Sequence, residues 1–163
     1  MPGVFRFTAN VNETDENLSA VLEAFEELFT NQALVGIPEE DSVRLNDSVS
    51  NAQLLYIHSN GSSVNNIPAR PVIEPAIEHE KEQIASLLQS AAEAAANGDR
   101  RSALAGLEKA ATHGANLSQD WFTNQANGWP ELKRETIKRK GSDRPLVDTD
   151  EMRKSITYKV DRI

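Results

Sequence analysis

Residues 73–114, IEPAIEHEKEQIASLLQSAAEAAANGDRRSALAGLEKAATHG, decide the fold, because two amphipathic helical stretches flank Asn97-Gly98. The first stretch has Pro75 in its first turn and predicts one helix of about 23 residues, roughly 35 Å long. Asp99 is the expected N-cap of the second helix, which we expect to end at Gly114. Alanines on both stripes permit close approach, so this stretch predicts a long antiparallel αα-hairpin.

Shorter elements are expected on both sides of this hairpin. An apolar stripe from Leu18 to Phe29 predicts a helix capped by Thr14 or Asp15. Residues 51–59 permit a buried strand or a short helix, and we favour the helix because Asn60-Gly61 can cap it. Strands are expected at 5–11, 33–37 and 156–160, and further short helices at 118–127, 130–140 and 148–152.

These elements together predict an α+β fold. We expect a small, mainly antiparallel sheet of about three strands packed against roughly four to six helices, including the hairpin. The length of 163 residues is typical of a single domain. We therefore expect one domain over residues 1–163, in which residues 1–12 form an extended arm or strand and residues 13–163 form the α+β body.

Composition excludes several classes of function. The chain contains no cysteine, which removes disulfide frameworks, thiolate nucleophiles and cysteine-bound metals. Neither a membrane-spanning segment nor a secretory leader is expected, and we predict assembly in a reducing cytoplasm.

Charge is divided unevenly along the chain. Residues 1–60 carry ten acidic and two basic groups, whereas 131–144 has a local charge of +3 within a neutral remainder. This division is compatible with head-to-tail contact between copies or with complementary partners, and two solvated faces of a monomer are the simpler reading.

No recognisable catalytic or metal site is present in the sequence. The three histidines, His58, His79 and His113, are more than 20 residues apart, and no HExxH, phosphate-binding loop or GxSxG elbow occurs. We therefore expect a protein that is not an enzyme and that has no cofactor. Lys138, Arg139 and Lys140 could reach phosphate, but the aromatic residues that bind single strands are missing there. A solubilising helix end is the alternative reading of these three residues.

Two segments carry a more specific pattern. The first is NAQLLYIHSNGSSVNNIPARP at 51–71, and the second is GWPELKRETIKRKGSDRPLVDTDEMRKSITYKV at 128–160. Together they resemble the small neck or tail-completion proteins of tailed bacteriophages, a family also described as minor tail components or virion morphogenesis proteins. The resemblance rests on a Y-x-H helix ending in glycine, an IPxRP loop, a TIxRKG run and a PLxDT turn. Asp150 stands where that family usually has glycine, so we expect an ordinary φ there or a different packing of the neighbouring subunit.

The resemblance implies a structural role in the virion. Such proteins form rings without catalysis, usually six-fold, at the upper end of the tail. The implied partners are other copies of the chain, the head-tail connector, the tail terminator or tail tube protein, and passing genomic DNA, with no membrane. A tail terminator that sets tube length is one alternative. An accessory nucleic-acid-binding protein that uses residues 133–144 is another, from a different class.

The same resemblance and the local chemistry nominate individual residues. Arg70 would anchor a neighbouring chain or cap its own helix, and Trp129 would pack across an interface or in its own core. Asp148 and Thr149 are expected to cap a helix, with contact to a partner as their second role. The remaining candidates are Asp150 and Tyr158 for subunit contacts, and Lys138, Arg139 and Lys140 for the wall of a DNA channel.

Overall fold

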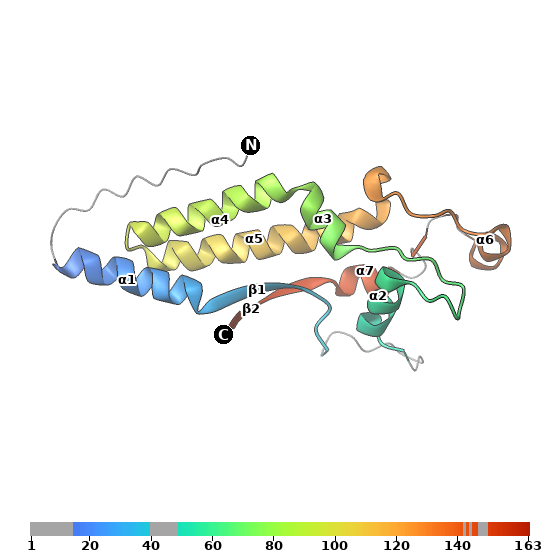
Figure 1. Ribbon diagram of the computed structural model, residues 1–163, viewed down its shortest axis with the longest axis horizontal. Coiled ribbons are helices and arrows are strands. Elements are labelled where there is room, and N and C mark those ends of the chain that lie inside the picture. The colour runs from blue at the N-terminus through green and yellow to red at the C-terminus, as the bar shows by residue number, and fades with distance from the viewer. Residues whose placement is uncertain (1–14, 40–48, 142, 144, 147–149) are drawn as a thin grey trace. The chain divides into compact units, whose positions relative to one another are not determined.

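A computed structural model describes residues 15–39, 49–141, 143, 145–146 and 150–163 (Figure 1). That part of the chain contains seven α-helices, two short 3-10 helices and a two-stranded antiparallel sheet. The α+β class predicted from the sequence is confirmed. The arm or strand expected within residues 1–12 and the helix cap at Thr14 lie outside the described residues.

Contacts divide the chain into two compact units. Among the described residues, unit 1 comprises 15–34, 82–111 and 160–163, and unit 2 comprises 35–39, 49–81 and the described part of 112–159. Helix α5 (Arg100–Asp120) and the strands β1 (Asn31–Gly36) and β2 (Thr157–Arg162) contribute residues to both units. The single-domain organisation stays a prediction.

Unit 1 is built on helices α1 (Asp15–Phe29), α4 (Lys81–Ala96) and α5. The αα-hairpin predicted from the sequence is present, with α4 and α5 lying side by side (Figure 1). Small residues form its core, since Ala24, Ala95 and Ala103 are fully buried. A Cβ added to Gly106 would lie 2.7 Å from the Cβ of Ala91, so the two helices approach closely at that point.

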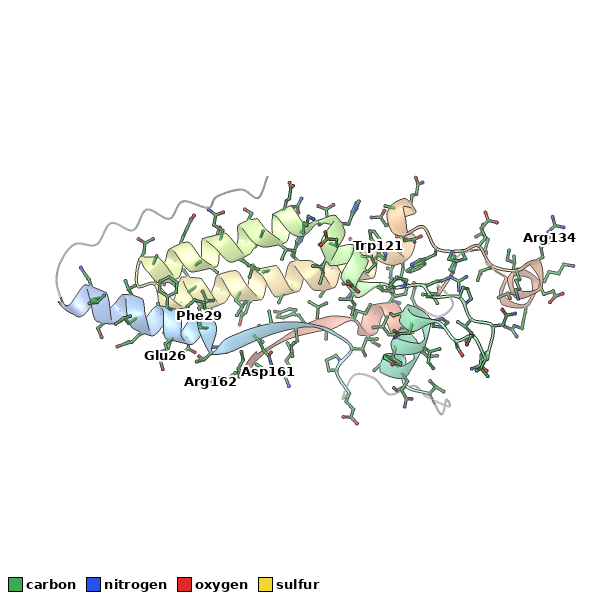
Figure 2. All side chains as sticks on the ribbon, in the orientation of Figure 1. Glu26, Phe29, Trp121, Arg134, Asp161 and Arg162 are labelled. Carbon is green, nitrogen blue, oxygen red and sulfur yellow. The ribbon has the colours of Figure 1, made fainter. Side chains whose placement is uncertain are left out.

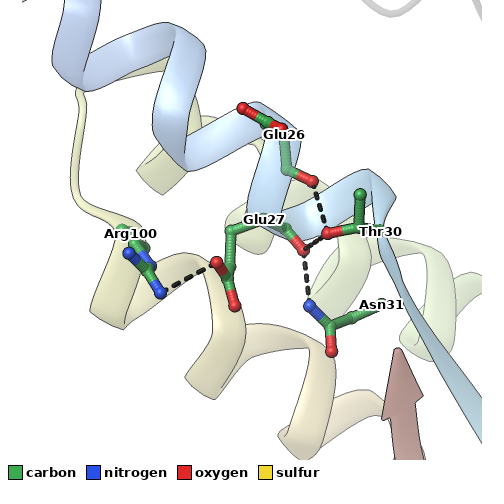
Figure 3. A network of polar contacts seen from close by, with 5 residues as sticks. All are labelled: Glu26, Glu27, Thr30, Asn31 and Arg100. Carbon is green, nitrogen blue, oxygen red and sulfur yellow. Dashed lines mark hydrogen bonds and ion pairs between the residues drawn. The ribbon is translucent and has the colours of Figure 1, made fainter. Parts of the chain in front are cut away.

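Polar contacts hold the C-terminal end of α1 in unit 1 (Figure 3). Glu27 forms an ion pair with Arg100 at 2.8 Å, which links α1 to the first turn of α5. Thr30 Oγ1 donates to the Glu26 carbonyl at 2.8 Å, and Asn31 Nδ2 donates to the Glu27 carbonyl at 2.7 Å. The Glu26 carbonyl also accepts from the Thr30 amide at 2.9 Å, whereas the bond from Asn31 satisfies the Glu27 carbonyl at the end of the helix.

Unit 2 contains the remaining short helices. They are α2 (Asn51–Asn60), α3 (Ile73–His79), α6 (Arg134–Lys140) and α7 (Glu151–Ser155), with 3-10 turns at Trp121–Thr123 and Gln125–Asn127. Helix α2 begins with a capping box formed by Ser50 and Gln53, which confirms the helical reading of 51–59. The buried core consists of Leu55, Val72, Ala76, Trp121, Phe122, Met152 and Ile156.

The first helix of the predicted hairpin is interrupted. The sequence predicts one rod from residue 73 onward, but α3 ends at His79 and α4 begins at Lys81, with Glu80 outside the helical region at φ −113°, ψ 26°. The apolar stripe explains the break, since residues 78–83 carry no apolar side chain to hold one continuous helix on a core. Lys81 donates to Glu78 Oε1 across the break at 2.6 Å.

The second helix of the hairpin is longer than predicted. The helix passes through Gly114 instead of ending there. A small residue is needed at this position, because a Cβ there would lie 3.2 Å from Val35 Cγ2. The helix expected at 118–127 is wrong as well. Its first residues complete α5, and two 3-10 turns follow, separated by Asn124 in an extended conformation. Glycine at 114 thus permits close packing against β1 within unit 2.

The predicted number of elements also needs correction. The described residues contain seven α-helices rather than four to six. The helix predicted from Pro130 begins at Arg134, and residue 133 is still extended at φ −63°, ψ 144°. Two strands are described rather than three, and the strand expected at 5–11 lies outside the described residues.

Candidate functional site

Unit 2 contains an open pocket of about 580 Å³. Its walls come from α2, the turn at 62–68, the segment 131–139 with α6, and residues 146–152 leading into α7. Every residue that lines it belongs to 51–70 or to 131–152. The two segments that carry the phage resemblance therefore meet at one site.

A tight turn after α2 forms one wall of this pocket. Gly61 adopts φ +71°, and a Cβ there would lie 2.8 Å from the amide nitrogen of Ala69, so only glycine fits. Ser62 and Ile67 then pair by two backbone hydrogen bonds of 2.8 Å. The Arg70 amide donates to the His58 carbonyl at 2.6 Å, which returns the chain to α2.

Arg70 is buried in this wall, with only 5% of its surface exposed. Its Nη2 donates to the carbonyl of Pro130 at 2.8 Å, and its Nε has no hydrogen-bond partner among the described residues. Burial lowers the pKa of the guanidinium from its ordinary value, because desolvation disfavours the charged form. The capping contact to its own helix is thus replaced by a bond to the segment before α6.

Trp129 holds the same segment from the other side. Its Nε1 donates to the Pro71 carbonyl at 3.0 Å, and its ring packs edge-on against Phe122 with centroids 5.7 Å apart. Of the two roles considered for Trp129, packing within its own chain is the one observed. Trp129 and Arg70 together keep residues 129–132 extended, which explains why α6 begins only at Arg134.

The wall near α7 is tied to α2. Asn51 is buried, its Nδ2 donates to Ser155 Oγ at 2.9 Å, and Ser155 Oγ donates to the Glu151 carbonyl. Gln119 Nε2 donates to the carbonyl of Ile156 at 2.7 Å, which fixes the end of α7 against α5 within unit 2. Sequence reasoning missed Asn51, although its place directly after the capping residue of α2 was readable.

The expectation of an ordinary φ at Asp150 is wrong. Its φ is +59°, not the ordinary negative value expected from the replacement of glycine. Aspartate tolerates the left-handed region better than most residues, so the turn before α7 keeps the backbone that a glycine would adopt. Asp150 lines the pocket, with its Oδ1 3.9 Å from Arg153 Nε.

Helix α6 supplies the basic side of the pocket. Lys133 and Arg139 line the pocket, and the side chains of Arg134 (labelled in Figure 2) and Lys138 are exposed. Lys140 is the last residue of α6, and its side chain lies outside the described part. Acidic groups also line the pocket, at Asp150 and Glu151 next to α7 and at Glu131 at the approach to α6.

The other predicted site residues lie elsewhere or are not described. Tyr158 is half-buried on β2 and does not line the pocket, whereas Asp148 and Thr149 lie outside the described residues. Throughout the described ranges, no group of three or more His, Asp or Glu side chains could hold a metal ion. Among the helices described, none has the length and apolar character needed to cross a bilayer.

Comparison with known proteins does not assign a family. Neither a protein-family model nor a curated protein nor a solved structure matches this chain.

Proposed function

We propose that this protein is a structural virion component of a tailed phage, which forms a ring of identical subunits in the neck. The ring completes the tail and joins it to the head connector, after assembly in the cytoplasm of the bacterial host. One observation carries the proposal: the two segments that resemble tail-completion proteins, far apart in the sequence, line one pocket. Segments with a shared role are expected to meet in this way, whereas chance resemblances have no reason to.

Subunit contact fits the chemistry of this pocket better than catalysis does. Its buried polar groups act on the chain itself: Arg70 binds the Pro130 carbonyl, and Asn51 binds Ser155. The pocket is open and is lined by both basic and acidic side chains, which suits recognition of a protein surface. The protein would work without cofactor and without catalysis, and a six-fold ring is what the resemblance implies.

The sheet offers a second surface for assembly. In the described residues β1 and β2 pair only with each other, so each strand has one edge without a sheet partner. Unpaired edges are templates on which a neighbouring chain can add a strand. The connector and the tail terminator or tube protein are the expected partners beside further copies.

A nucleic-acid-binding role is the second candidate, because α6 exposes Arg134 and Lys138 beside Arg139. Such a role predicts DNA binding by the purified protein that weakens steeply as salt rises. Replacing Arg134 and Lys138 by glutamate would abolish that binding. Lys109→Glu, an exposed charge on α5, is the matched control.

Deletion of the gene from a phage genome tests the proposed function. Negative-stain electron microscopy of the lysate should show DNA-filled heads beside separate tails of normal length, and wild-type protein supplied in trans should restore joined particles. Overlong tails would replace the joining role with that of a tail terminator. Intact infectious particles would overturn the structural role and favour the nucleic-acid-binding alternative.

A further inference from the structure

Helix α1 carries an apolar stripe that the described residues of its unit cover only in part. The stripe, called here the α1 ridge, consists of Leu18, Leu22, Phe25 and Phe29, spaced by four, three and four residues. Leu18, Leu22 and Phe29 are 53%, 61% and 71% exposed, and Phe29 stacks on Phe25 with ring centroids 5.7 Å apart. This spacing is the seam by which one helix packs on another surface.

The exposed part of the α1 ridge points away from the face that α1 uses within unit 1, and Phe25 at its edge packs against the core of that unit. That inner face is marked by Ala20, which lies beside Gly98, and by Ala24, which is fully buried. At 100° per residue the centres of the two faces lie roughly 150° apart. The ridge is therefore a second apolar face, of the kind that marks a contact with another protein.

The charge beside the α1 ridge selects the partner. Helix α1 has five acidic residues and no lysine or arginine. Glu27 is used by Arg100 within unit 1, whereas Glu23 and Glu26 are exposed, and Figure 2 labels Glu26 and Phe29 on this helix. Pairing of two α1 ridges would bring acidic groups together, so a basic surface is the better partner.

The α6 side of the unit 2 pocket offers basic groups of this kind next to apolar ones. Apolar side chains of Leu54, Ile67, Leu132, Leu146 and Met152 line it. Lys133 and Arg139 stand on its α6 side, and Arg70 adds a buried positive charge that pairs with no carboxylate among the described residues. The acids at the pocket are Glu131, Asp150 and Glu151, two of them on the α7 side, so the charges also give the bound helix a direction.

We propose that the α1 ridge of one copy docks into the unit 2 pocket of a second copy, with Glu23 and Glu26 facing α6. This contact joins two different patches, so it is heterologous and can close a ring. This inference rests on the proposed function, which includes a ring of identical subunits. It adds to that function the two surfaces by which neighbouring subunits would touch.

Complementary variants test this contact by mass. The full-length wild-type chain should sediment as an oligomer, whereas Leu22→Ser and the pair Lys133→Glu with Arg139→Glu should each sediment at the subunit mass of 18.0 kDa. Leu22→Ser keeps its pocket, and the variant with Lys133→Glu and Arg139→Glu keeps its ridge. A mixture of the two can therefore form only one kind of contact and should give dimers and nothing larger. Leu88→Ser, at a leucine of α4 that is 42% exposed, is the matched control and should remain oligomeric.

Cross-linking tests the register, because the chain has no cysteine of its own. Leu22→Cys mixed with Lys133→Cys should give a disulfide-linked dimer on mild oxidation, and Leu88→Cys mixed with Lys133→Cys should not. A chain that carries both Glu26→Lys and Lys133→Glu exchanges the two charges. If this double variant assembles again, the result supports an arrangement in which α1 of one copy faces α6 of the next. These variants alter exposed side chains, and circular dichroism checks that each one keeps its helices.

Three results would overturn the inference. The wild-type chain could remain monomeric at every concentration tested, or Leu22→Ser could leave the oligomer unchanged. Alternatively, the pocket variant could still pair while the ridge variant does not, which would indicate ridge-to-ridge pairing. The phage deletion is independent of all three, since joined, infectious particles without the gene would overturn the proposed function and leave the contact between copies standing.

Discussion

At the scale of single residues, Gly106 and Gly114 lie on the same helix but tolerate a methyl group differently. Alanine at either position gains roughly 1 kcal/mol of helix propensity. At Gly106 the new Cβ would lie 2.9 Å from the Cα of Ala91, which cannot move without shifting α4, whereas at Gly114 it meets the end of the Val35 side chain at 3.2 Å. We expect Gly106→Ala to lower the free energy of unfolding by about 1–3 kcal/mol.

Gly114→Ala is the internal control for this comparison. Its free energy of unfolding should stay within about 1 kcal/mol of the wild-type value, because Val35 can give way and the propensity gain offsets the strain. Urea denaturation followed by circular dichroism measures both variants. Equal stability of the two would contradict the close approach of α4 and α5 at Gly106.

Arg70 presents a different balance. The hydrogen bond from its charged guanidinium to Pro130 contributes about 1.5–3 kcal/mol. The desolvation of the guanidinium, which also lowers its pKa, offsets much of that gain. Removing the charge leaves only a neutral carbonyl without its donor. We therefore expect Arg70→Met to change the free energy of unfolding by less than about 1 kcal/mol while weakening assembly.

Leu55→Ala provides the scale for that measurement. Leu55 belongs to the buried core of unit 2, and its truncation should lower the free energy of unfolding by about 2–5 kcal/mol. If Arg70→Met cost as much as Leu55→Ala in urea denaturation, Arg70 would be a structural residue. If Arg70→Met loses little stability but no longer forms the oligomer, Arg70 serves the contact between subunits.

At the scale of elements, Asp99 makes the start of α5 sensitive to pH. Its Oδ1 accepts from the Ser102 amide at 2.9 Å, and this bond lowers the pKa of Asp99. A carboxyl whose pKa is lowered by folding stabilises the fold above its unfolded pKa, and this contribution is lost as pH falls through the folded pKa. We expect the stability advantage over Asp99→Ala to shrink below about pH 4.

Asp99→Asn separates the cap from the charge. Asparagine caps a helix as well as aspartate does but does not titrate. Its advantage over Asp99→Ala should therefore be the same in thermal denaturation at neutral and acid pH. If the stability advantage of the wild type over Asp99→Ala is also the same at neutral and acid pH, the carboxylate of Asp99 is not the group that titrates.

Elements defined by local signals could be predicted, and those defined by packing could not. Asp99, Asn97-Gly98 and Asn60-Gly61 mark helix ends by their own chemistry, and the structure places ends there. Glycine at 114 carries the same local signal, yet α5 continues through it because a small residue is needed against Val35. The interruption at Glu80 likewise depends on which core each side of the helix reaches.

At the scale of the whole molecule, the class of the fold followed from periodicity, but the assembly of the pocket did not. Arg70 and Arg139 were singled out separately, one as an anchor and one as a DNA contact, and both line the same pocket. Asn51 attracted no attention because its bond to Ser155 spans 104 residues of sequence. Periodicity reports which face of an element is apolar, not which distant element it meets.

Net charge and local charge make opposite predictions for assembly. Copies with a net charge of −8 repel one another, so salt should strengthen association if repulsion between whole copies dominates. If Glu23 and Glu26 of one copy face α6 of the next, salt should weaken association. We expect the second effect to dominate at short range, because the Debye length falls from about 10 Å at 0.1 M to about 3 Å at 1 M.

Sedimentation over this range of salt decides between the two effects. Two or three exposed pairs at about 0.5 kcal/mol each predict a dissociation constant that rises roughly tenfold. In the variant with Lys133→Gln and Arg139→Gln the attraction is removed at the two basic residues of the pocket. Repulsion between whole copies then dominates, so the dissociation constant of this variant should fall as salt rises. A wild-type dissociation constant that falls in parallel would mean that the acidic helix of one copy does not face the basic helix of the next.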